Sequence, residues 1–204
     1  MTTSARAEGT RARLLAAART EFAEHGMSGA RVDRIAERAG ANKERIYGYF
    51  GSKEKLFTAV VAEALNEHAV RVGLPDGDPG EYAGRMYDYH RSNPELTRML
   101  MWEALHYGDR AVPGGEVRTA HYARKAAALA ESTGGRLTGD AAATFLALIG
   151  VAVWPLAFPQ MARLVLDTGE GPPDADALRA HVVETARKLA PPRPGCQGLR
   201  ATAT

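Results

Sequence analysis

Cysteine is nearly absent from this chain of 204 residues, in which Cys196 is the single example. One cysteine excludes an intrachain disulfide, and such usage is typical of proteins in a reducing cytoplasm. The N-terminus also lacks an apolar segment followed by a small-residue cleavage site, so we expect no signal peptide. The sequence therefore predicts a cytoplasmic protein, and its 45% of hydrophobic residues are enough to form a core.

Segments with the two-residue alternation of β-strands are missing, and so are the short motifs of several enzyme classes. There is no nucleophile elbow, no P-loop and no paired Cys/His spacing for a metal. Gly134 and Gly135 lie between helical segments and lack the strand that a dinucleotide-binding motif requires. The sequence thus predicts an all-α protein without enzymatic activity, cofactor or metal.

One alternative to this prediction is a helical metal enzyme. Glu103 and His106 have the Glu-x-x-His spacing of a di-iron site. Such a site needs a second copy of the motif and two further carboxylates, and no second copy follows in the sequence. Metal analysis of the purified protein tests this alternative.

Strong net charge is absent as well, since 26 Lys and Arg face 24 Asp and Glu. The charge is unevenly distributed. Residues 1–55 hold 11 basic and 7 acidic side chains, whereas the remainder holds 15 and 17. A basic excess in the N-terminal part favours contact between that part and the phosphates of DNA.

Helical periodicity, capping residues and Gly/Pro breaks divide the chain into expected helices. Their ranges are 9–25, 32–39, 43–49, 53–71, 81–92, 94–107, 116–133, 139–167 and 174–189. Residues 1–8 are expected to be loose, and the clearest loop spans 73–80. Residues 191–204 are expected to be a disordered tail.

Residues 31–50 have the features of a helix-turn-helix. Ala36 lets two helices approach closely, and Gly40 supplies the left-handed backbone that ends the first one. Ile46 fills the space between them. Asn42 is a suitable N-cap for the second helix, because its side-chain oxygen accepts an N–H that has no helical partner. The outer side of that helix is poor in hydrophobic residues and can face a DNA groove.

The stretch RIAERAGANKERIYGYFGSKEKLF resembles the N-terminal domain of the TetR family of bacterial transcription regulators. The match covers roughly residues 9–68. It implies a helix-turn-helix domain over 9–68, which a long fourth helix joins to a larger effector-binding and dimerisation domain over 69–190. It further implies a homodimer that binds a palindromic double-stranded operator, and a small-molecule effector that releases the DNA. Repression is the usual output of the family.

The resemblance and the outward side of the second helix together assign residues to DNA binding. They are Arg31, Val32, Asp33, Lys43, Glu44, Arg45, Tyr47, Gly48, Tyr49 and Lys53. Arg45 is the candidate for a base contact, because a guanidinium can bond guanine O6 and N7 together. Lys53 is the candidate for a phosphate contact at the positive end of the fourth helix. For Tyr47 and Tyr49, packing into the core is the alternative.

Several positions depart from the family pattern. Arg31 stands where Thr is usual, so the usual cap of the second helix is missing, a loss of ~1 kcal/mol. Ala41 stands where Val is usual, and Glu44 and Arg45 replace small residues. We therefore expect an operator preference particular to this chain. Arg34 and Arg38 are expected to lie on a solvated helix face rather than to contact DNA directly.

Residues 141–158 are almost entirely apolar and reach the length threshold of a membrane span. Their alanine content and the prolines Pro155 and Pro159 argue against a span, so we expect a buried helix and no membrane contact. The prolines predict a bend near residues 154–161. Together with the last helix, this segment is expected to form the homodimer interface.

Large aromatic and polar side chains in the middle of the chain suit a small, mainly apolar effector. The candidate effector-binding residues are Tyr82, Met86, Tyr89, His90, Met99, Trp102, Glu103, His106, Tyr107, Tyr122, Phe145, Ile149, Trp154 and Phe158. Glu103, His90 and His106 are the polar groups of interest among them. For each residue a place in the core is the alternative. For the whole chain, the alternative is a constitutive DNA-binding protein without an effector.

Overall fold

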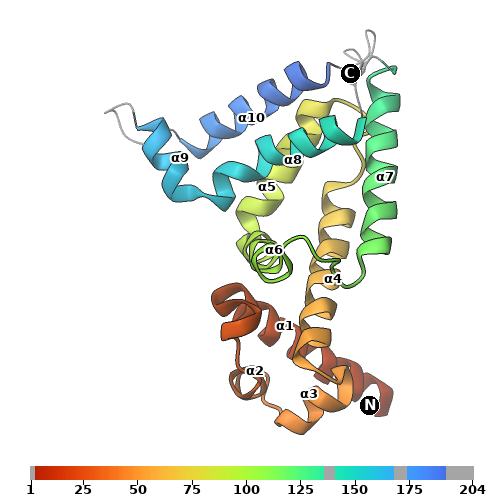
Figure 1. Ribbon diagram of the computed structural model, residues 1–204, viewed down its shortest axis with the longest axis vertical. Coiled ribbons are helices and arrows are strands. Elements are labelled where there is room, and N and C mark those ends of the chain that lie inside the picture. Colours follow the sequence, from red (N-terminus) through yellow and green to blue (C-terminus); the bar gives the residue numbers. More distant parts are fainter. Residues whose placement is uncertain (1–2, 136–140, 168–173, 192–204) are drawn as a thin grey trace, which may run out of the picture. The chain divides into compact units, whose positions relative to one another are not determined.

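The computed structural model describes residues 3–135, 141–167 and 174–191, which form α-helices and no strand (Figure 1). The all-α class is therefore confirmed. The helices are α1 (Thr3–Gly29), α2 (Val32–Arg38), α3 (Lys43–Phe50), α4 (Lys53–Val72), α5 (Pro79–Ser92), α6 (Pro94–Tyr107), α7 (Gly115–Ser132), α8 (Ala141–Ala157), α9 (Pro159–Leu166) and α10 (Ala175–Leu189).

The helices divide into two compact units. The first unit contains α1, α2, α3, α4 as far as Glu67, and α6. The second unit contains α4 from His68 onward, α5, and α7 to α10. The division within α4 falls between Glu67 and His68, one residue before the expected domain boundary. However, α6 packs against α1 in the first unit, whereas the sequence placed it in the effector domain.

The core of the first unit is built from the apolar stripes of its helices. Phe22 and Phe57 are fully buried and meet edge to face, with ring centroids 5.0 Å apart. Ile35 and Ile46 are also fully buried and join α2 and α3 to that core. Burial of these side chains fixes the helix-turn-helix on α1 and α4.

Side chains beside the helix N-termini cap α3 and α4 in this unit. Asn42 Oδ1 accepts a hydrogen bond from the Arg45 N–H at 3.0 Å, and Ser52 Oγ accepts one from the Lys55 N–H at 3.2 Å. Both predicted caps are thus confirmed. The expectation of a loose segment over residues 1–8 is wrong for residues 3–8, because α1 already begins at Thr3, and residues 1–2 lie outside the described part of the chain. The residues before Gly9 contain no helix breaker, so nothing local stops the helix there.

In the second unit, α5 packs against α8 and α10 (Figure 1). Glycine makes the close approach to α10 possible, because a Cβ on Gly80 would lie 2.7 Å from the Val183 carbonyl oxygen. Two ion pairs hold the same helices together. Arg179 Nε donates to both oxygens of Asp88 at 2.9 and 2.8 Å, and Arg187 Nε donates to Asp78 at 2.8 Å.

The predicted helix over residues 139–167 is broken in two, and its first residues lie outside the described part of the chain. α8 and α9 meet at an angle of 90°. Phe158 lies between them with φ −122° and ψ 63°, because a residue before proline is driven out of the helical region. The predicted bend is confirmed at Pro159, while Pro155 stays inside α8. No single described helix has the length and hydropathy to cross a membrane; only this bent pair does together. The tail predicted over 191–204 lies almost wholly outside the described residues.

Candidate nucleic-acid interface

The turn between α2 and α3 closes with a glycine in the left-handed region. Gly40 has φ 60°, its N–H donates to the Glu37 carbonyl at 3.1 Å, and the Ala41 N–H donates to the Ala36 carbonyl at 2.9 Å. These two bonds form a Schellman motif, which satisfies carbonyls that lack helical partners. The turn thereby sets the angle at which α3 leaves α2, as the sequence predicted from Gly40.

α3 is anchored by one side and exposed on the other. Ile46 and Phe50 are buried, at 0% and 8% exposure. The remaining residues of the helix are exposed and form its outer side: Lys43, Glu44, Arg45, Tyr47, Gly48 and Tyr49. An open hollow lies along this side, lined by Asn42, Glu44, Arg45, Gly48 and Tyr49. The predicted recognition residues of α3 are thus brought together on one surface.

The tyrosines of α3 lie on the surface and not in the core. Tyr47 is 43% exposed and Tyr49 is 40% exposed. The Tyr49 hydroxyl donates a hydrogen bond to the Ala7 carbonyl of α1 at 3.2 Å, which orients its ring. The core alternative for both residues is therefore wrong. Both side chains are therefore on the surface, and a phosphate contact of the Tyr49 hydroxyl would replace its bond to Ala7.

The basic side chains of this surface differ in their partners. Lys43 Nζ forms an ion pair with Asp33 of α2 at 3.1 Å, and this hydrogen bond raises the pKa of Lys43. Lys53 Nζ donates to the Ala30 carbonyl at 3.3 Å from the first turn of α4. The Arg45 guanidinium has no hydrogen-bond or ion-pair partner within the described residues. Arg45 is thus the cation of α3 that is most available to an incoming ligand.

At the start of α2, one prediction from the sequence holds and another does not. Arg31 makes no side-chain cap, as its departure from threonine predicted. Its backbone N–H instead donates to Glu21 Oε1 of α1 at 2.8 Å. Val32 is buried at 7% exposure, so its side chain packs into the unit and does not face a groove. Of residues 31–33, only Arg31 and Asp33 present exposed side chains.

Glu21 is a buried carboxylate that holds the start of α2, and sequence reasoning missed it. Arg34 Nε donates to the same Oε1 atom at 2.8 Å, and the guanidinium forms an ion pair of 2.6 Å. Burial alone raises the pKa of Glu21, but the bonds from Arg34 and Arg31 outweigh it and lower that pKa. Arg34 therefore binds a partner on α1 that the sequence did not indicate, although its side chain remains 40% exposed.

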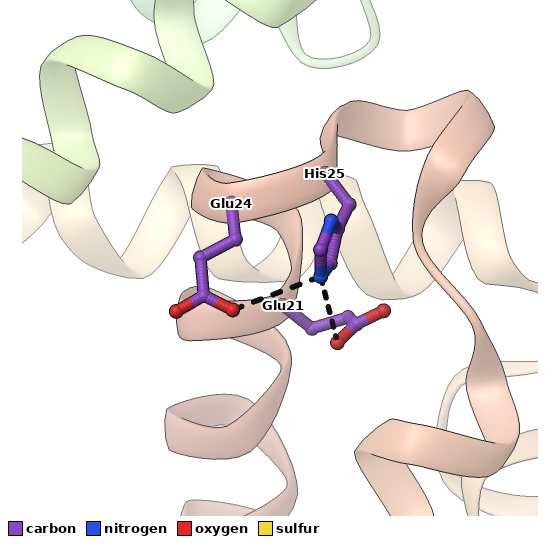
Figure 2. A group of neighbouring side chains, drawn as sticks. All are labelled: Glu21, Glu24 and His25. Atoms are coloured by element: carbon purple, nitrogen blue, oxygen red, sulfur yellow. Dashed lines mark ion pairs between the residues drawn. The ribbon is translucent and has the colours of Figure 1, made fainter.

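Figure 2 shows the neighbours of Glu21 on α1. His25 Nε2 lies 3.9 Å from Glu21 Oε2 and 3.7 Å from Glu24 Oε2, and one ligand atom from each residue fits within 4.8 Å of the others. Such spacing suits a metal ion, yet both carboxylates already face arginines. Arg34 pairs with Glu21, and Arg38 lies 3.7 Å from Glu24. We interpret the cluster as an ion-pair network that supports α2.

The effector candidates on α6 lie in the first unit. Met99 and Glu103 are buried there, at 0% and 6% exposure. The Trp102 ring covers Gly26, where a Cβ would lie 2.7 Å from its Cδ2 atom. His106 and Tyr107 stack edge to face with centroids 4.8 Å apart. These five candidates thus belong to the first unit.

The other effector candidates lie in the second unit and divide by depth. The buried members are Tyr82, Met86, Tyr89, His90 and Phe145. Ile149 is half-buried, and the exposed members are Tyr122, Trp154 and Phe158. The Phe145 ring lies 6.1 Å from Tyr82 and 6.4 Å from Tyr122, so these three form one cluster. Trp154 and Phe158 form a separate pair with centroids 4.3 Å apart.

Comparison with known proteins agrees with this geometry in both halves of the chain. Residues 14–60 match the model of the bacterial regulatory proteins of the tetR family. Residues 78–188 match a tetracyclin repressor-like C-terminal domain.

Individual relatives cover nearly the whole chain. The HTH-type transcriptional repressor SCO4008 of Streptomyces coelicolor is 38% identical over 185 residues, which span 89% of this chain and 95% of that protein. The HTH-type transcriptional repressor NicS of Pseudomonas putida is 36% identical over 109 residues, spanning 50% and 51%. Among solved structures, that of SCO4942 from Streptomyces coelicolor, titled a transcriptional regulator, superposes with a TM-score of 0.77 at 31% identity. It covers 90% of this chain and 99% of that one. The chain is therefore a DNA-binding regulator and not an enzyme, and it belongs to the TetR family of bacterial transcriptional regulators.

Proposed function

We propose that this protein is a ligand-responsive repressor that binds a palindromic operator as a homodimer. A small, mainly apolar effector binds the second unit and releases the DNA. The observation that carries the proposal is the outer side of α3, where exposed polar side chains surround an open hollow on a firmly anchored helix.

We assign recognition of the DNA base sequence to Arg45 and its neighbours on α3. The Arg45 guanidinium makes no hydrogen bond or ion pair with a described residue, so DNA binding breaks no existing interaction of that group. A guanidinium in the major groove donates to guanine O6 and N7 at once. Glu44 beside it accepts from cytosine N4, and Gly48 leaves room for close approach of the helix.

Phosphate contacts are assigned to residues at the edges of this surface. Lys53 stands in the first turn of α4, where the positive end of the helix dipole also attracts a phosphate. Its Nζ exchanges the Ala30 carbonyl for a phosphate oxygen at little cost, because both are hydrogen-bond acceptors. Arg31, exposed before α2, and the hydroxyls of Tyr47 and Tyr49 supply further donors.

Dimerisation is assigned to the apolar surface of the last three helices. Large apolar side chains on α8, α9 and α10 are exposed in the single chain. They are Leu146, Trp154, Phe158, Met161, Leu164, Val165 and Leu189. Large exposed apolar side chains that gather into one patch are typical of an interface. A second copy of the chain covers it in the proposal, as predicted from the two final helical segments.

Release of DNA is proposed to be a shift of population between two dimer states. In the state that binds the operator, two α3 helices enter successive major grooves, ~34–36 Å apart. An effector that binds the other state more tightly removes this spacing and lowers the affinity for DNA.

Selection of bound sequences from random double-stranded DNA tests the proposal. We expect an inverted repeat whose half-sites lie ~10–10.5 base pairs apart or a multiple of that distance. A compound that raises the melting temperature should then weaken binding to the selected operator. Enrichment of no sequence, or of a single unrepeated site, contradicts the palindromic dimer. If no stabilising compound changes the affinity for the operator, the result supports the alternative of a constitutive DNA-binding protein without an effector.

A further inference from the structure

Lys125 of α7 is a buried lysine without an acidic partner. Its side chain is 2% exposed, and no carboxylate of the described residues forms an ion pair with it. The interaction it does make is with an aromatic ring, since Nζ lies 5.7 Å from the centroid of Tyr82. A buried ammonium without a counter-charge is costly, so its presence indicates a missing partner.

The groups near Lys125 are also left incomplete. The Tyr82 hydroxyl and His68 Nε2 are buried and have no hydrogen-bond partner among the described residues. Buried polar groups of this kind are nearly always paired in a folded protein. Lys125 lies near both residues, since its Nζ faces the Tyr82 ring and its charge acts on His68. All three groups can donate a hydrogen bond, and one anionic ligand that accepts from them would satisfy them together.

At neutral pH the positive charge of this cluster belongs to Lys125. Burial, together with the charge of Lys125, lowers the pKa of His68 to about 3 and of His90 to about 4. Burial and the nearby Arg124 lower the pKa of Lys125 itself to about 8. The ammonium is thus still protonated at neutral pH, while the imidazoles are neutral. One positive charge suits a singly charged anion better than a phosphate dianion.

The rest of the cluster is apolar. Met86 is buried at 2% exposure, and the Phe145 ring lies 6.1 Å from the Tyr82 ring. Such side chains suit the hydrocarbon or aromatic part of a ligand. The polar and apolar groups together describe a small amphipathic molecule.

We propose that Lys125, Tyr82 and His68 bind the carboxylate of the effector, which is a small organic acid with an apolar body. The carboxylate oxygens accept from Lys125 Nζ and the Tyr82 hydroxyl, and the apolar body packs toward Met86 and Phe145. The inference rests on the ligand response proposed above and specifies the chemical class of that ligand.

The test uses the full chain and a defined set of probes. They are benzoate, phenylacetate and octanoate, each compared with its uncharged amide at ~10 mM in thermal unfolding. We expect at least one acid to raise the melting temperature, while its amide does not. Lys125→Met should weaken binding of that acid by about 10- to 100-fold. Tyr82→Phe, which removes only an unpaired hydroxyl, should weaken it by about 3- to 10-fold. Lys188→Met, at an exposed site on α10, is the matched control and should not change it.

Three results overturn the proposal: no acid stabilises the wild-type chain, the amides bind as tightly as the acids, or Lys125→Met and Tyr82→Phe both keep wild-type affinity. Operator binding separates this inference from the proposed function. If a neutral or cationic compound releases the operator, the ligand response stands and the acid-binding inference fails. If an acid binds through Lys125 without affecting the operator, the acid site stands and the ligand response fails.

Discussion

The Glu21 carboxylate of α1 accepts the backbone N–H of Arg31, the N-cap residue of α2, at 2.8 Å, and so takes the place of the third-position glutamate in a capping box. The acceptor comes from another helix and also binds Arg34. The first helix of the helix-turn-helix is thereby attached to α1 by a charged group that is completely buried.

Replacing Glu21 by glutamine should therefore destabilise the protein. Glu21→Gln keeps an oxygen for the Arg31 N–H but removes the charge that binds Arg34, a loss of about 1–3 kcal/mol in the free energy of unfolding. Urea denaturation measures it. Glu24→Gln on the same helix, with an exposed side chain, is the control and should stay within ~0.5 kcal/mol of wild type. Equal effects of the two variants would show that Glu21 does not support α2.

Gly26 ends the long segment of α1 in a conformation that other residues avoid, with φ 64°, and lies beneath the Trp102 ring. Gly26→Ala places a Cβ 2.7 Å from Trp102 Cδ2 in this strained backbone and should cost about 1–3 kcal/mol. Gly9→Ala is the matched control, because nothing lies within 4 Å of the added Cβ. It should gain about 0.5–1 kcal/mol, since alanine favours the helix. A neutral Gly26→Ala change in thermal unfolding contradicts the contact.

The buried histidines of the second unit predict a loss of stability in acid. Burial lowers the pKa of His68 to about 3 and of His90 to about 4, from an ordinary 6.5. As the pH falls below 6.5, the unfolded chain takes up protons at these sites while the folded chain does not. Each pH unit between about 6.5 and 4 should cost ~1.4 kcal/mol per histidine.

Urea unfolding at about pH 7 and pH 5 measures this effect. The double variant His68→Gln, His90→Gln should lose clearly less stability over the interval than the wild type. His181→Gln on the exposed side of α10 is the control and should behave as the wild type does. The same loss in the double variant would assign the acid sensitivity to other groups.

Val165 of α9 tests the dimer surface. It is 74% exposed in the single chain, and Val165→Glu would bury a charge in the proposed interface. We expect dimerisation to weaken by about 10- to 100-fold in sedimentation velocity. Val117→Glu on α7 is matched, because Val117 is 76% exposed and lies outside the last three helices. A wild-type protein that is monomeric at micromolar concentration contradicts the assigned surface outright.

Features that depend on a few neighbouring residues could be predicted from the sequence. Gly40, Asn42 and Ser52 locate the ends of α2, α3 and α4, because a left-handed glycine or a capping oxygen acts on backbone within three residues. Pro94 begins α6 and Pro159 begins α9 for a similarly local reason.

Features that depend on distant residues could not be predicted. A glutamate or lysine on an amphipathic helix is usually solvated, so nothing local indicates that Glu21 and Lys125 are buried. Their neighbours belong to other helices. Arg34 of α2 binds Glu21 of α1, and Tyr82 of α5 contacts Lys125 of α7. The place of α6 in the first unit has the same cause, because α6 packs against α1, which is distant in the sequence.

The central claim is that α3 reads the operator and that Arg45 provides a base contact. The direct measurement is fluorescence anisotropy of wild-type and Arg45→Ala proteins on the selected operator and on every single-base-pair variant of it. Lys53→Ala serves as the comparison, since loss of a phosphate contact should lower affinity evenly and reduce the salt slope by about one. Arg45→Ala should cost about 1–3 kcal/mol and remove discrimination at one base pair in each half-site. An even loss on all sequences, or none, would contradict the claim.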